Sequence, residues 1–327
     1  MDGSLYRIRP FQDGDFEAES RMTNRLFPEN PVSAEEIRHF HDSLEVPGVF
    51  KSPWAVEKIG SGEVVALGMI FHAPWAFDPD RYWVSLGVEP AHQHRGIGRS
   101  LYQTLEGIAI SRRAKALWAT VRSDHPRCVQ FFERAAFVER RRNWTSILDL
   151  TQVPPDRSHR NRETKNLEGV EFTSVAREGP GQDDAQERLY RLDCESGKDA
   201  PRMGPSTDLP FDQFIDLVFR GPGYLPEGIL VAKVGDEYVA YTYVFKLPSQ
   251  PDTLHVGFTG TLPAYRGRGI ASELKLRAIE LTRSLGYHYL MTNNDTVNKR
   301  IWAINEKLGF QQVRTWIQGQ KDLVRTG

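Results

Sequence analysis

The sequence predicts an α/β fold (α+β in the order of its elements) that is built twice along one chain. Three observations lead to this prediction. The chain has 327 residues and is 39% hydrophobic, which is long for one domain and sufficient for two sizeable cores. One pattern of residues recurs at a constant distance along the sequence. Each copy alternates strand-like runs with helix-like stripes.

The repeat is clearest in two glycine-containing segments. "GVEPAHQHRGIGRSL" begins at Gly87 and "GTLPAYRGRGIASEL" begins at Gly260, so the offset is 173 residues (260 − 87 = 173). The same offset relates "FFERAAF", which ends at Phe137, to "INEKLGF", which ends at Phe310 (310 − 137 = 173). No insertion separates these landmarks, and the sequence therefore indicates a duplicated domain.

The repeat divides the chain into two domains. We expect an N-terminal domain over residues 1–152 and a C-terminal domain over residues 169–327. Residues 153–168 are polar and nearly free of large apolar side chains, which is typical of a connector between domains.

The strands of the second copy follow from apolar runs and turn residues. "GILVAKVG" (228–235) and "EYVAYTYVF" (237–245) predict a two-stranded hairpin around Gly235 and Asp236. "TLHVGFTGTL" predicts a third strand that Pro263 ends.

Two helices and another strand complete this copy. Apolar residues at three- and four-residue spacing predict a helix from about Gly269 to Ser284, with Gly286 just beyond its end. "YHYLMT" predicts a strand, and a last helix is expected from near Val297 to Leu308, closed by Gly309.

The composition limits the partners and the compartment. Lys plus Arg number 42 and Asp plus Glu number 43, which disfavours nucleic acid as the main partner. Cys128 and Cys194 form neither a disulfide framework nor a metal-ligand spacing, so no metal is expected. The start "MDGSLYRIRP" has no apolar core, and no apolar run reaches about 18 residues. We therefore expect a cytoplasmic protein with no membrane partner.

The glycine-containing segments also have the chemistry of an anion site. A helix start leaves amides without internal partners and carries partial positive charge. Gly267 and Gly269 would let the backbone approach a ligand closely, and Arg266 and Arg268 would add positive charge. Such a loop fits a pyrophosphate, although an ordinary surface turn would have the same composition. Neither copy has the Gly-x-Gly-x-x-Gly of dinucleotide sites or the Gly-Lys-Ser/Thr of a P-loop.

The two glycine-containing segments resemble a motif of a known family. Arg266-x-x-Gly269-x-Ala271 and Gln93-x-x-Gly96-x-Gly98 are similar to the acyl-CoA pyrophosphate loop of the GNAT (GCN5-related) N-acetyltransferases. The preceding strand, the following helix and the closing "EKLGF" strengthen the resemblance, which covers both halves. It implies two tandem GNAT-like domains, each a mixed, mostly antiparallel sheet flanked by helices.

The resemblance implies acetyl-CoA as the acyl donor. It places contacts to the diphosphate and the pantetheine arm on both copies, at Leu262, Arg266, Gly267, Arg268, Gly269, Ile270, Ala271 and Asn298 in the C-terminal half and at Val88, Gln93, His94, Arg95, Gly96, Ile97 and Gly98 in the N-terminal half. His125 stands in the first copy where Asn298 stands in the second.

The implied reaction is attack of an amine on the thioester. The family often has a tyrosine acid before "EKLGF", where this chain has Asn305, and Phe132 in the first copy. Neither can act as that acid, but Asn305 is a catalytic candidate as a hydrogen-bond donor to the departing thiol. His255 at the start of a strand is a candidate base, although a structural histidine is the commoner case. The arginine at the loop start and the complete "EKLGF" favour the C-terminal half for catalysis, with the N-terminal half as a scaffold or second nucleotide site.

The acceptor and the oligomeric state stay open at this stage. Asp193, Glu195 and Asp199 could bind a cationic amine, but an ordinary solvated face is favoured. Cys194 is expected to pack rather than react, and Tyr241 to lie in the core or the cleft wall. The acceptor would be a small-molecule or protein amine, and the chain a monomer with an internal pseudo-dimer or a homodimer. The alternatives are a non-catalytic, CoA-binding regulatory protein and, more weakly, an RNA-binding one.

Overall fold

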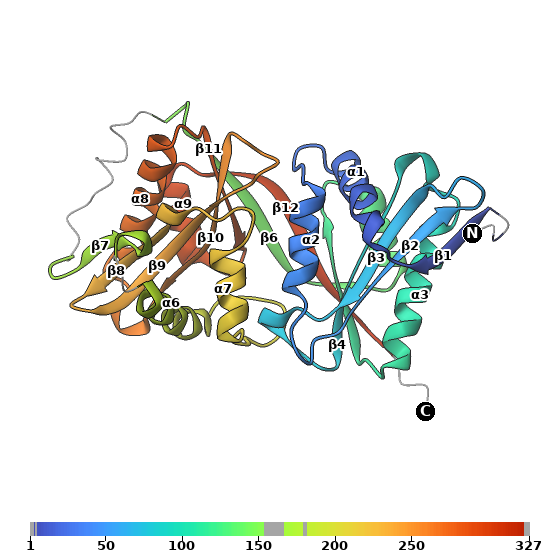
Figure 1. Ribbon diagram of the computed structural model, residues 1–327, viewed down its shortest axis with the longest axis horizontal. Coiled ribbons are helices and arrows are strands. Elements are labelled where there is room, and N and C mark those ends of the chain that lie inside the picture. Colours follow the sequence, from blue (N-terminus) through green and yellow to red (C-terminus); the bar gives the residue numbers. More distant parts are fainter. Residues whose placement is uncertain (1–2, 4, 154–166, 179–181, 324–327) are drawn as a thin grey trace. The chain divides into compact units, whose positions relative to one another are not determined.

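The computed structural model of the protein describes residues 3, 5–153, 167–178 and 182–323 (Figure 1). The connector expected over 153–168 lies outside the described residues, apart from residues 153, 167 and 168. The chain forms two compact units. The N-terminal unit contains Met1–Arg141, Met203–Thr207 and Trp316–Gly327, and the C-terminal unit contains Arg142–Arg202 and Asp208–Thr315.

The N-terminal unit is a mixed sheet with helices on both faces. Its strands are β1 (Tyr6–Pro10), β2 (Lys51–Lys58), β3 (Val64–Phe71), β4 (Arg81–Val88) and β5 (Ala116–Arg122), in the order β1-β2-β3-β4-β5. Its helices are α1 (Phe16–Leu26), α2 (Ala34–Ser43), α3 (Ile97–Ser111) and α4 (Pro126–Arg134). All neighbouring pairs among these strands are antiparallel except β4 and β5, which are parallel.

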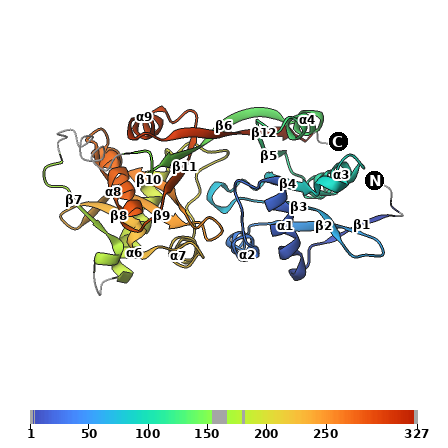
Figure 2. The same ribbon diagram turned by 90° about the horizontal axis from the view of Figure 1, so that it is seen from above.

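Adjacent residues of one strand show which helix covers which face. Val56 packs in one core cluster with Leu101 of α3, whereas Ala55 packs in another with Met22 of α1. Because successive strand residues point to opposite faces of a sheet, α3 and α1 cover opposite faces. Figure 2 shows α3 and α1 on the two sides of these strands.

The C-terminal unit repeats this plan. Its strands are β7 (Glu171–Ser174), β8 (Ile229–Val234), β9 (Glu237–Lys246), β10 (Thr253–Thr261) and β11 (Tyr289–Asp295), in the order β11-β10-β9-β8-β7. Its helices are α6 (Gln182–Gly197), α7 (Phe211–Phe219), α8 (Ile270–Ser284) and α9 (Lys299–Leu308). Leu230 of β8 packs with the α8 cluster and Val231 with the α6 and α7 cluster, so these helices also cover opposite faces.

The predicted elements of the second copy are present. The helix expected to start near Gly269 is α8, and the last helix is α9. Gly286 (φ +80°) and Gly309 (φ +98°) follow them in the left-handed conformation that favours glycine. The predicted α/β fold class is confirmed.

The last strand of each half completes the sheet of the other half. In β6 (Val138–Asp149), residues Asn143–Asp149 pair with β11 of the C-terminal unit. In β12 (Gln311–Asp322), residues Trp316–Asp322 pair with β5 of the N-terminal unit. The domain limits predicted above follow chain order, whereas the compact units follow these pairings.

Candidate functional site

Each unit contains a pair of parallel strands that separate partway along their length. β4 pairs with β5 over Arg81–Trp83 and then continues to Val88 beside β3. In the same way, β10 pairs with β11 over Thr253–Val256. Beyond these pairings, the carboxyl ends of the two strands diverge, which leaves backbone groups along the opening available to a ligand.

A loop and a helix start follow each of these strands. After β4, the loop ends at Gly96 (φ 76°), which precedes α3, and after β10 it ends at Gly269 (φ 90°), which precedes α8. Neither glycine has a side chain that could cap the first amides of its helix. These amides and the positive end of the helix dipole therefore suit an anion.

The two loops have the same backbone shape despite different residues. His94 (φ 62°) and Gly267 (φ +80°) occupy equivalent positions (267 − 94 = 173), and both are left-handed. A non-glycine residue in this region is uncommon. A Cβ added at Gly267 would meet no atom within 4 Å, so this loop is open rather than packed against protein.

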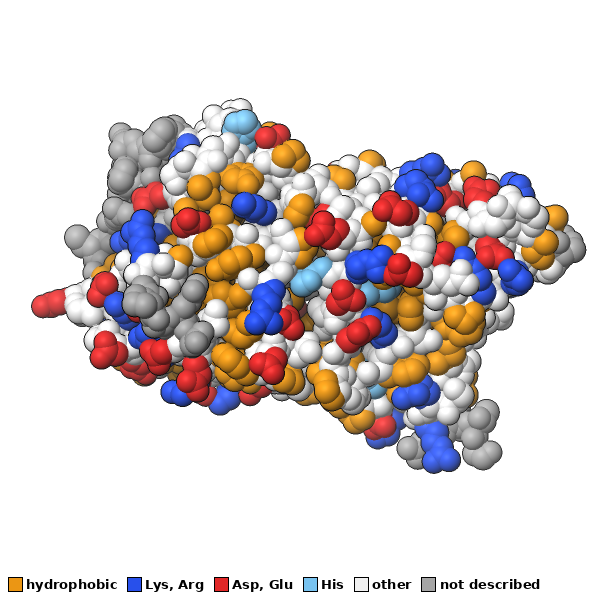
Figure 3. Space-filling model, in the orientation of Figure 1, with side chains coloured by type: hydrophobic (Ala, Val, Ile, Leu, Met, Phe, Trp, Pro, Cys, Tyr) orange, Lys and Arg blue, Asp and Glu red, His pale blue; other side chains and the backbone are white. Residues whose placement is uncertain are grey.

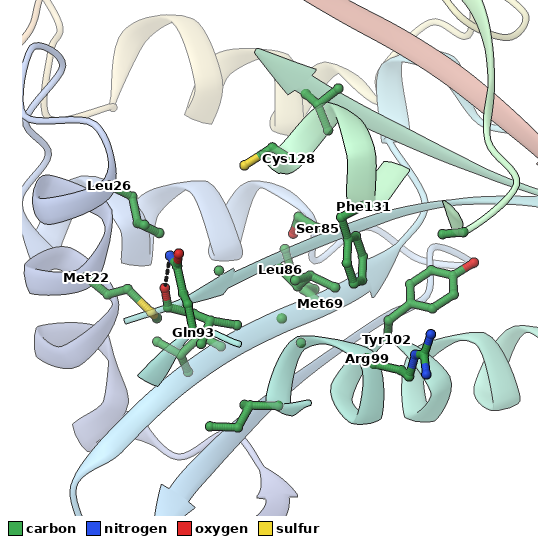
Figure 4. Close-up of a pocket in the computed structure, with 18 of the residues that line it drawn as sticks. Met22, Leu26, Met69, Ser85, Leu86, Gln93, Arg99, Tyr102, Cys128 and Phe131 are labelled. Carbon is green, nitrogen blue, oxygen red and sulfur yellow. Dashed lines mark hydrogen bonds between the residues drawn. The ribbon is translucent and has the colours of Figure 1, made fainter. Parts of the chain in front are cut away.

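A cavity of about 760 Å³ lies beside the loop of the N-terminal unit. Figure 4 shows side chains from four parts of the unit around it, with Met22 and Leu26 on α1, Gln93 in the loop, Arg99 on α3, and Cys128 and Phe131 on α4. The cavity is also lined by most of the residues predicted to hold acetyl-CoA in this half, namely Val88, Gln93, His94, Gly96, Ile97 and Gly98. Nη1 of Arg95 instead donates to the hydroxyl of Tyr6 at 3.2 Å.

A hydrogen bond from the first loop residue to the preceding strand is present in both units. Nε2 of Gln93 donates to the carbonyl oxygen of Val88 at 3.0 Å (dashed in Figure 4). Nε of Arg266 donates to the carbonyl oxygen of Thr261 at 3.0 Å. Thr261 is therefore the equivalent of Val88, and the backbone amide of Leu262 is already bonded within the sheet.

The arginines of the C-terminal loop have protein partners. Nη1 of Arg266 forms an ion pair with Asp199 at 2.7 Å, and Nη2 of Arg268 lies 3.4 Å from the carbonyl oxygen of Glu168. Gly269, Ile270 and Ala271 form the helix start itself.

The three acidic residues predicted as acceptor contacts each have a separate partner. Asp193 is half-buried and accepts a hydrogen bond from Tyr241, and desolvation raises the pKa of its carboxyl. Glu195 forms an ion pair with exposed Lys198, and Asp199 forms an ion pair with Arg266. The structure does not gather these carboxylates into one binding group.

The predicted catalytic side chains are enclosed. Burial lowers the pKa of His255 to about 4, so its imidazole is neutral, and its Nε2 lies 3.2 Å from Nδ2 of Asn293. Asn305 is 0% exposed, and its Nδ2 donates to Oδ1 of Asn294 at 2.6 Å. The side chain of Asn298 accepts from the backbone amide of Ile301 and caps α9.

The first copy differs at the corresponding positions. Phe132 stacks on Phe137 with ring centroids 5.0 Å apart and belongs to the core. His125 lines the cavity and stacks on Phe27 at 5.6 Å.

Sequence reasoning missed Tyr102 and its partners. Tyr102 lines the cavity, donates to Oε1 of Glu106 at 2.8 Å and accepts from Nζ of Lys321 at 3.2 Å. Burial raises the pKa of its phenol. The repeat could have revealed the position, because its equivalent (102 + 173 = 275) is Lys275, a change from a phenol to an amine.

The described residues contain no helix long and apolar enough to cross a membrane, and no group of three or more His, Cys, Asp or Glu side chains that could hold a metal ion. On the face drawn in Figure 3, acidic and basic side chains are interspersed rather than gathered by sign.

Comparison with known proteins supports the resemblance found in the sequence. The acetyltransferase (GNAT) family matches residues 17–137 and 187–310. The L-2,4-diaminobutyric acid acetyltransferases of Shouchella clausii and Methylotuvimicrobium alcaliphilum are 33% and 28% identical over 85 residues, or 26% of this chain. These matches span about half the length of the curated relatives, 48% and 49%.

Solved structures show the same fold over nearly the whole chain. A GCN5-related N-acetyltransferase from Sphaerobacter thermophilus has a TM-score of 0.70 and 18% identity, covering 97% of this chain and 95% of its own. A tandem GNAT protein from the clavulanic acid biosynthesis pathway has a TM-score of 0.71 and 16% identity, covering 98% and 100%. The chain belongs to the acetyltransferase (GNAT) family and is a tandem member of it.

Proposed function

We propose that the chain is an acetyl-CoA-dependent N-acetyltransferase whose acyl donor binds in the cavity of the N-terminal unit. The observation that carries this proposal is the cavity itself, which joins an uncapped helix start to the opening between β4 and β5. The sequence favoured the C-terminal half on the strength of its motif. The side chains around the two loops favour the other half.

The N-terminal loop fits the coenzyme. The amides of Gly96, Ile97 and Gly98 would hold the diphosphate at the start of α3, and exposed Arg99 lines the cavity one residue further on. The backbone of Val88, at the end of the diverging strand, would bind the pantetheine arm. The coenzyme supplies an acetyl group activated as a thioester, and a thiol with a pKa of about 8.5 leaves readily as its anion.

The candidate side chains of the C-terminal half are less suited to catalysing acetyl transfer. Arg266 is held by Asp199, and the predicted base His255 is neutral, buried and in contact with Asn293. Asn305 is bonded to Asn294. We therefore assign the C-terminal half a structural or coenzyme-binding role.

A small-molecule amine is the acceptor class that the comparisons favour. The curated relatives are named as acetyltransferases of L-2,4-diaminobutyric acid, an amino acid with a side-chain amine. A protein amine is the other acceptor that the sequence allows.

A matched pair of variants tests the proposal. Gly96→Glu and Gly269→Glu place the same carboxylate at the same backbone position of each loop. Acetyl-CoA affinity is measured by calorimetry, and thiol release is followed with a panel of primary amines that includes L-2,4-diaminobutyrate. Because a carboxylate at the helix start repels the diphosphate, we expect Gly96→Glu to weaken binding at least tenfold and to abolish turnover. Gly269→Glu should leave turnover unchanged.

Each other outcome has a clear meaning. Loss of turnover in Gly269→Glu alone would move the chemistry to the C-terminal half. Acetyl-CoA binding without thiol release across the panel would favour the non-catalytic, CoA-binding alternative. Circular dichroism on both variants controls for misfolding, since both glycines are left-handed and both substitutions introduce the same strain.

A further inference from the structure

Two polar atoms at the α1 and α2 end of the cavity face each other but have no hydrogen-bond partner among the described residues. Oε2 of Glu19, on α1, lies 3.5 Å from Nε2 of His41, on α2. Both atoms are buried, and neither has a hydrogen-bond partner among the described residues. The side chain of His41 is only 3% exposed. Both residues line the same cavity as the N-terminal loop.

This arrangement points to a ligand that donates hydrogen bonds. A carboxylate only accepts, and Nε2 of a neutral imidazole with its proton on Nδ1 also accepts. Buried polar atoms normally have partners, and leaving them without one is destabilising. An ammonium group carries three N–H donors and a positive charge. It can satisfy both atoms at once, and the charge of Glu19 attracts it.

The surroundings limit what is attached to the ammonium. Apolar side chains also line the cavity, namely Phe11, Met22, Leu26 and Phe27, and the ring centroid of Phe11 lies 5.4 Å from that of His41. They belong to α1 or to the segments that flank it. Such a lining favours a ligand whose ammonium continues into an apolar stem.

Cationic side chains outnumber carboxylates in the cavity lining, since Arg122, Arg127 and Arg134 line it in addition to Arg99. Glu106 is the other carboxylate in its lining, and it is already paired with Lys321. His94 and Arg99 lie at the loop end, where an anion is expected. Glu19 is therefore the carboxylate available to a cation in this lining.

We propose that Glu19 and His41 form the subsite for the acceptor amine, and that the acceptor is a primary amine on an apolar stem. This rests on the function proposed above. The ammonium donates to Oε2 of Glu19 and to Nε2 of His41. One N–H bond then breaks as its proton passes to Nε2, which leaves an imidazolium paired with the Glu19 carboxylate. The amine keeps the electron pair and is a neutral nucleophile.

The test uses the whole chain and a series of alkylamines from n-propylamine to n-hexylamine. Thiol release gives kcat and KM with acetyl-CoA as donor, and calorimetry gives the affinity for n-butylamine alone. Glu17→Gln is the matched control, because Glu17 is exposed on the same helix. We expect Glu19→Gln to raise the amine KM and to weaken n-butylamine binding by about tenfold or more, through loss of a charged hydrogen bond. Glu17→Gln should change neither.

His41→Gln separates binding from proton transfer. Glutamine can accept a hydrogen bond but cannot take up the proton at neutral pH. We expect kcat to fall by about 100-fold or more, with a much smaller change in the amine KM. A purely structural role for His41 would instead lower acetyl-CoA affinity and thermal stability together.

The outcomes separate this proposal from the previous one. If the wild type fails to bind acetyl-CoA, the proposed function is wrong, and n-butylamine binding still tests the subsite. Equal n-butylamine affinity in wild type and Glu19→Gln, or no binding of any amine in the series, would overturn the subsite. Unchanged acetyl-CoA affinity in both variants shows that the fold is intact.

Discussion

Lys275 on α8 allows a quantitative prediction about the C-terminal unit. It is 2% exposed, and its ammonium lies 5.7 Å from the ring centroid of Phe310. No carboxylate among the described residues forms an ion pair with it. Burial of the charged form lowers its pKa from 10.5 to about 7. Replacing Lys275 with methionine keeps most of the stem and removes the charge.

The size and sign of the effect follow from linkage. The difference between the unfolded and folded pKa of Lys275 (10.5 − 7 = 3.5) corresponds to at most roughly 5 kcal/mol. The unfolded chain keeps the proton up to pH 10.5, whereas the folded chain releases it near pH 7. The free energy of unfolding of the wild type therefore rises between these pH values, by up to about 1.4 kcal/mol per pH unit. Below pH 7 the full destabilisation is present.

Calorimetric and urea unfolding from about pH 6 to about pH 10 test this prediction. We expect Lys275→Met to be more stable than the wild type by a few kcal/mol near neutral pH, with a difference that shrinks as the pH rises. Lys299→Met, at an exposed position at the start of α9, is the control and should match the wild type. Where unfolding shows two transitions, only the one that contains α8 should respond. A pH-independent difference, or a less stable variant, would refute the reasoning.

The remaining predictions concern two glycines of the N-terminal unit and the two cysteines of the chain. A Cβ at Gly319 would lie 2.1 Å from the ring of Phe132 and 2.9 Å from a backbone oxygen, so Gly319→Ala should destabilise by about 1–3 kcal/mol. Gly107→Ala in α3, where a Cβ would meet nothing within 4 Å, should stabilise by about 0.5–1 kcal/mol. Urea unfolding measures the change in the free energy of unfolding for both variants. A change in the same direction for both would contradict the argument. Cys128 is exposed and lines the cavity, so saturating acetyl-CoA should slow its alkylation, followed by mass spectrometry. Burial raises the pKa of Cys194 to about 11, so this thiol should react slowly with or without acetyl-CoA. If acetyl-CoA does not slow the alkylation of Cys128, the coenzyme binds elsewhere.

Local structure was predictable because its causes are local. The helix over residues 270–284 follows from apolar spacing, and the glycines at 286 and 309 mark helix ends by their left-handed backbone. The loop shape was predictable for the same reason, since Gly269 both starts a helix and ends a turn. His94 was harder to interpret, because a histidine does not reveal the left-handed backbone it shares with Gly267.

The exchange of strands between the halves was not predictable from this sequence. The constant offset shows that both copies end in a similar strand. It contains no information on which sheet each strand joins, because either choice buries the same side-chain pattern. Residues Trp316–Asp322 pair with β5, which lies almost 200 positions earlier (316 − 122 = 194). Such a pairing depends on long-range packing rather than on local preference.

The difference between local backbone shape and long-range contacts also explains why the motif and the cavity favour different halves. Duplication has kept the backbone of both loops, so any motif that reports backbone shape matches both. The difference between the halves lies in side-chain partners. Arg266 strengthens the motif but is paired with Asp199, whereas Gln93 and Arg99 face a cavity that also contains Glu19. Assignment of the chemistry to one half therefore depends on contacts that form only after folding.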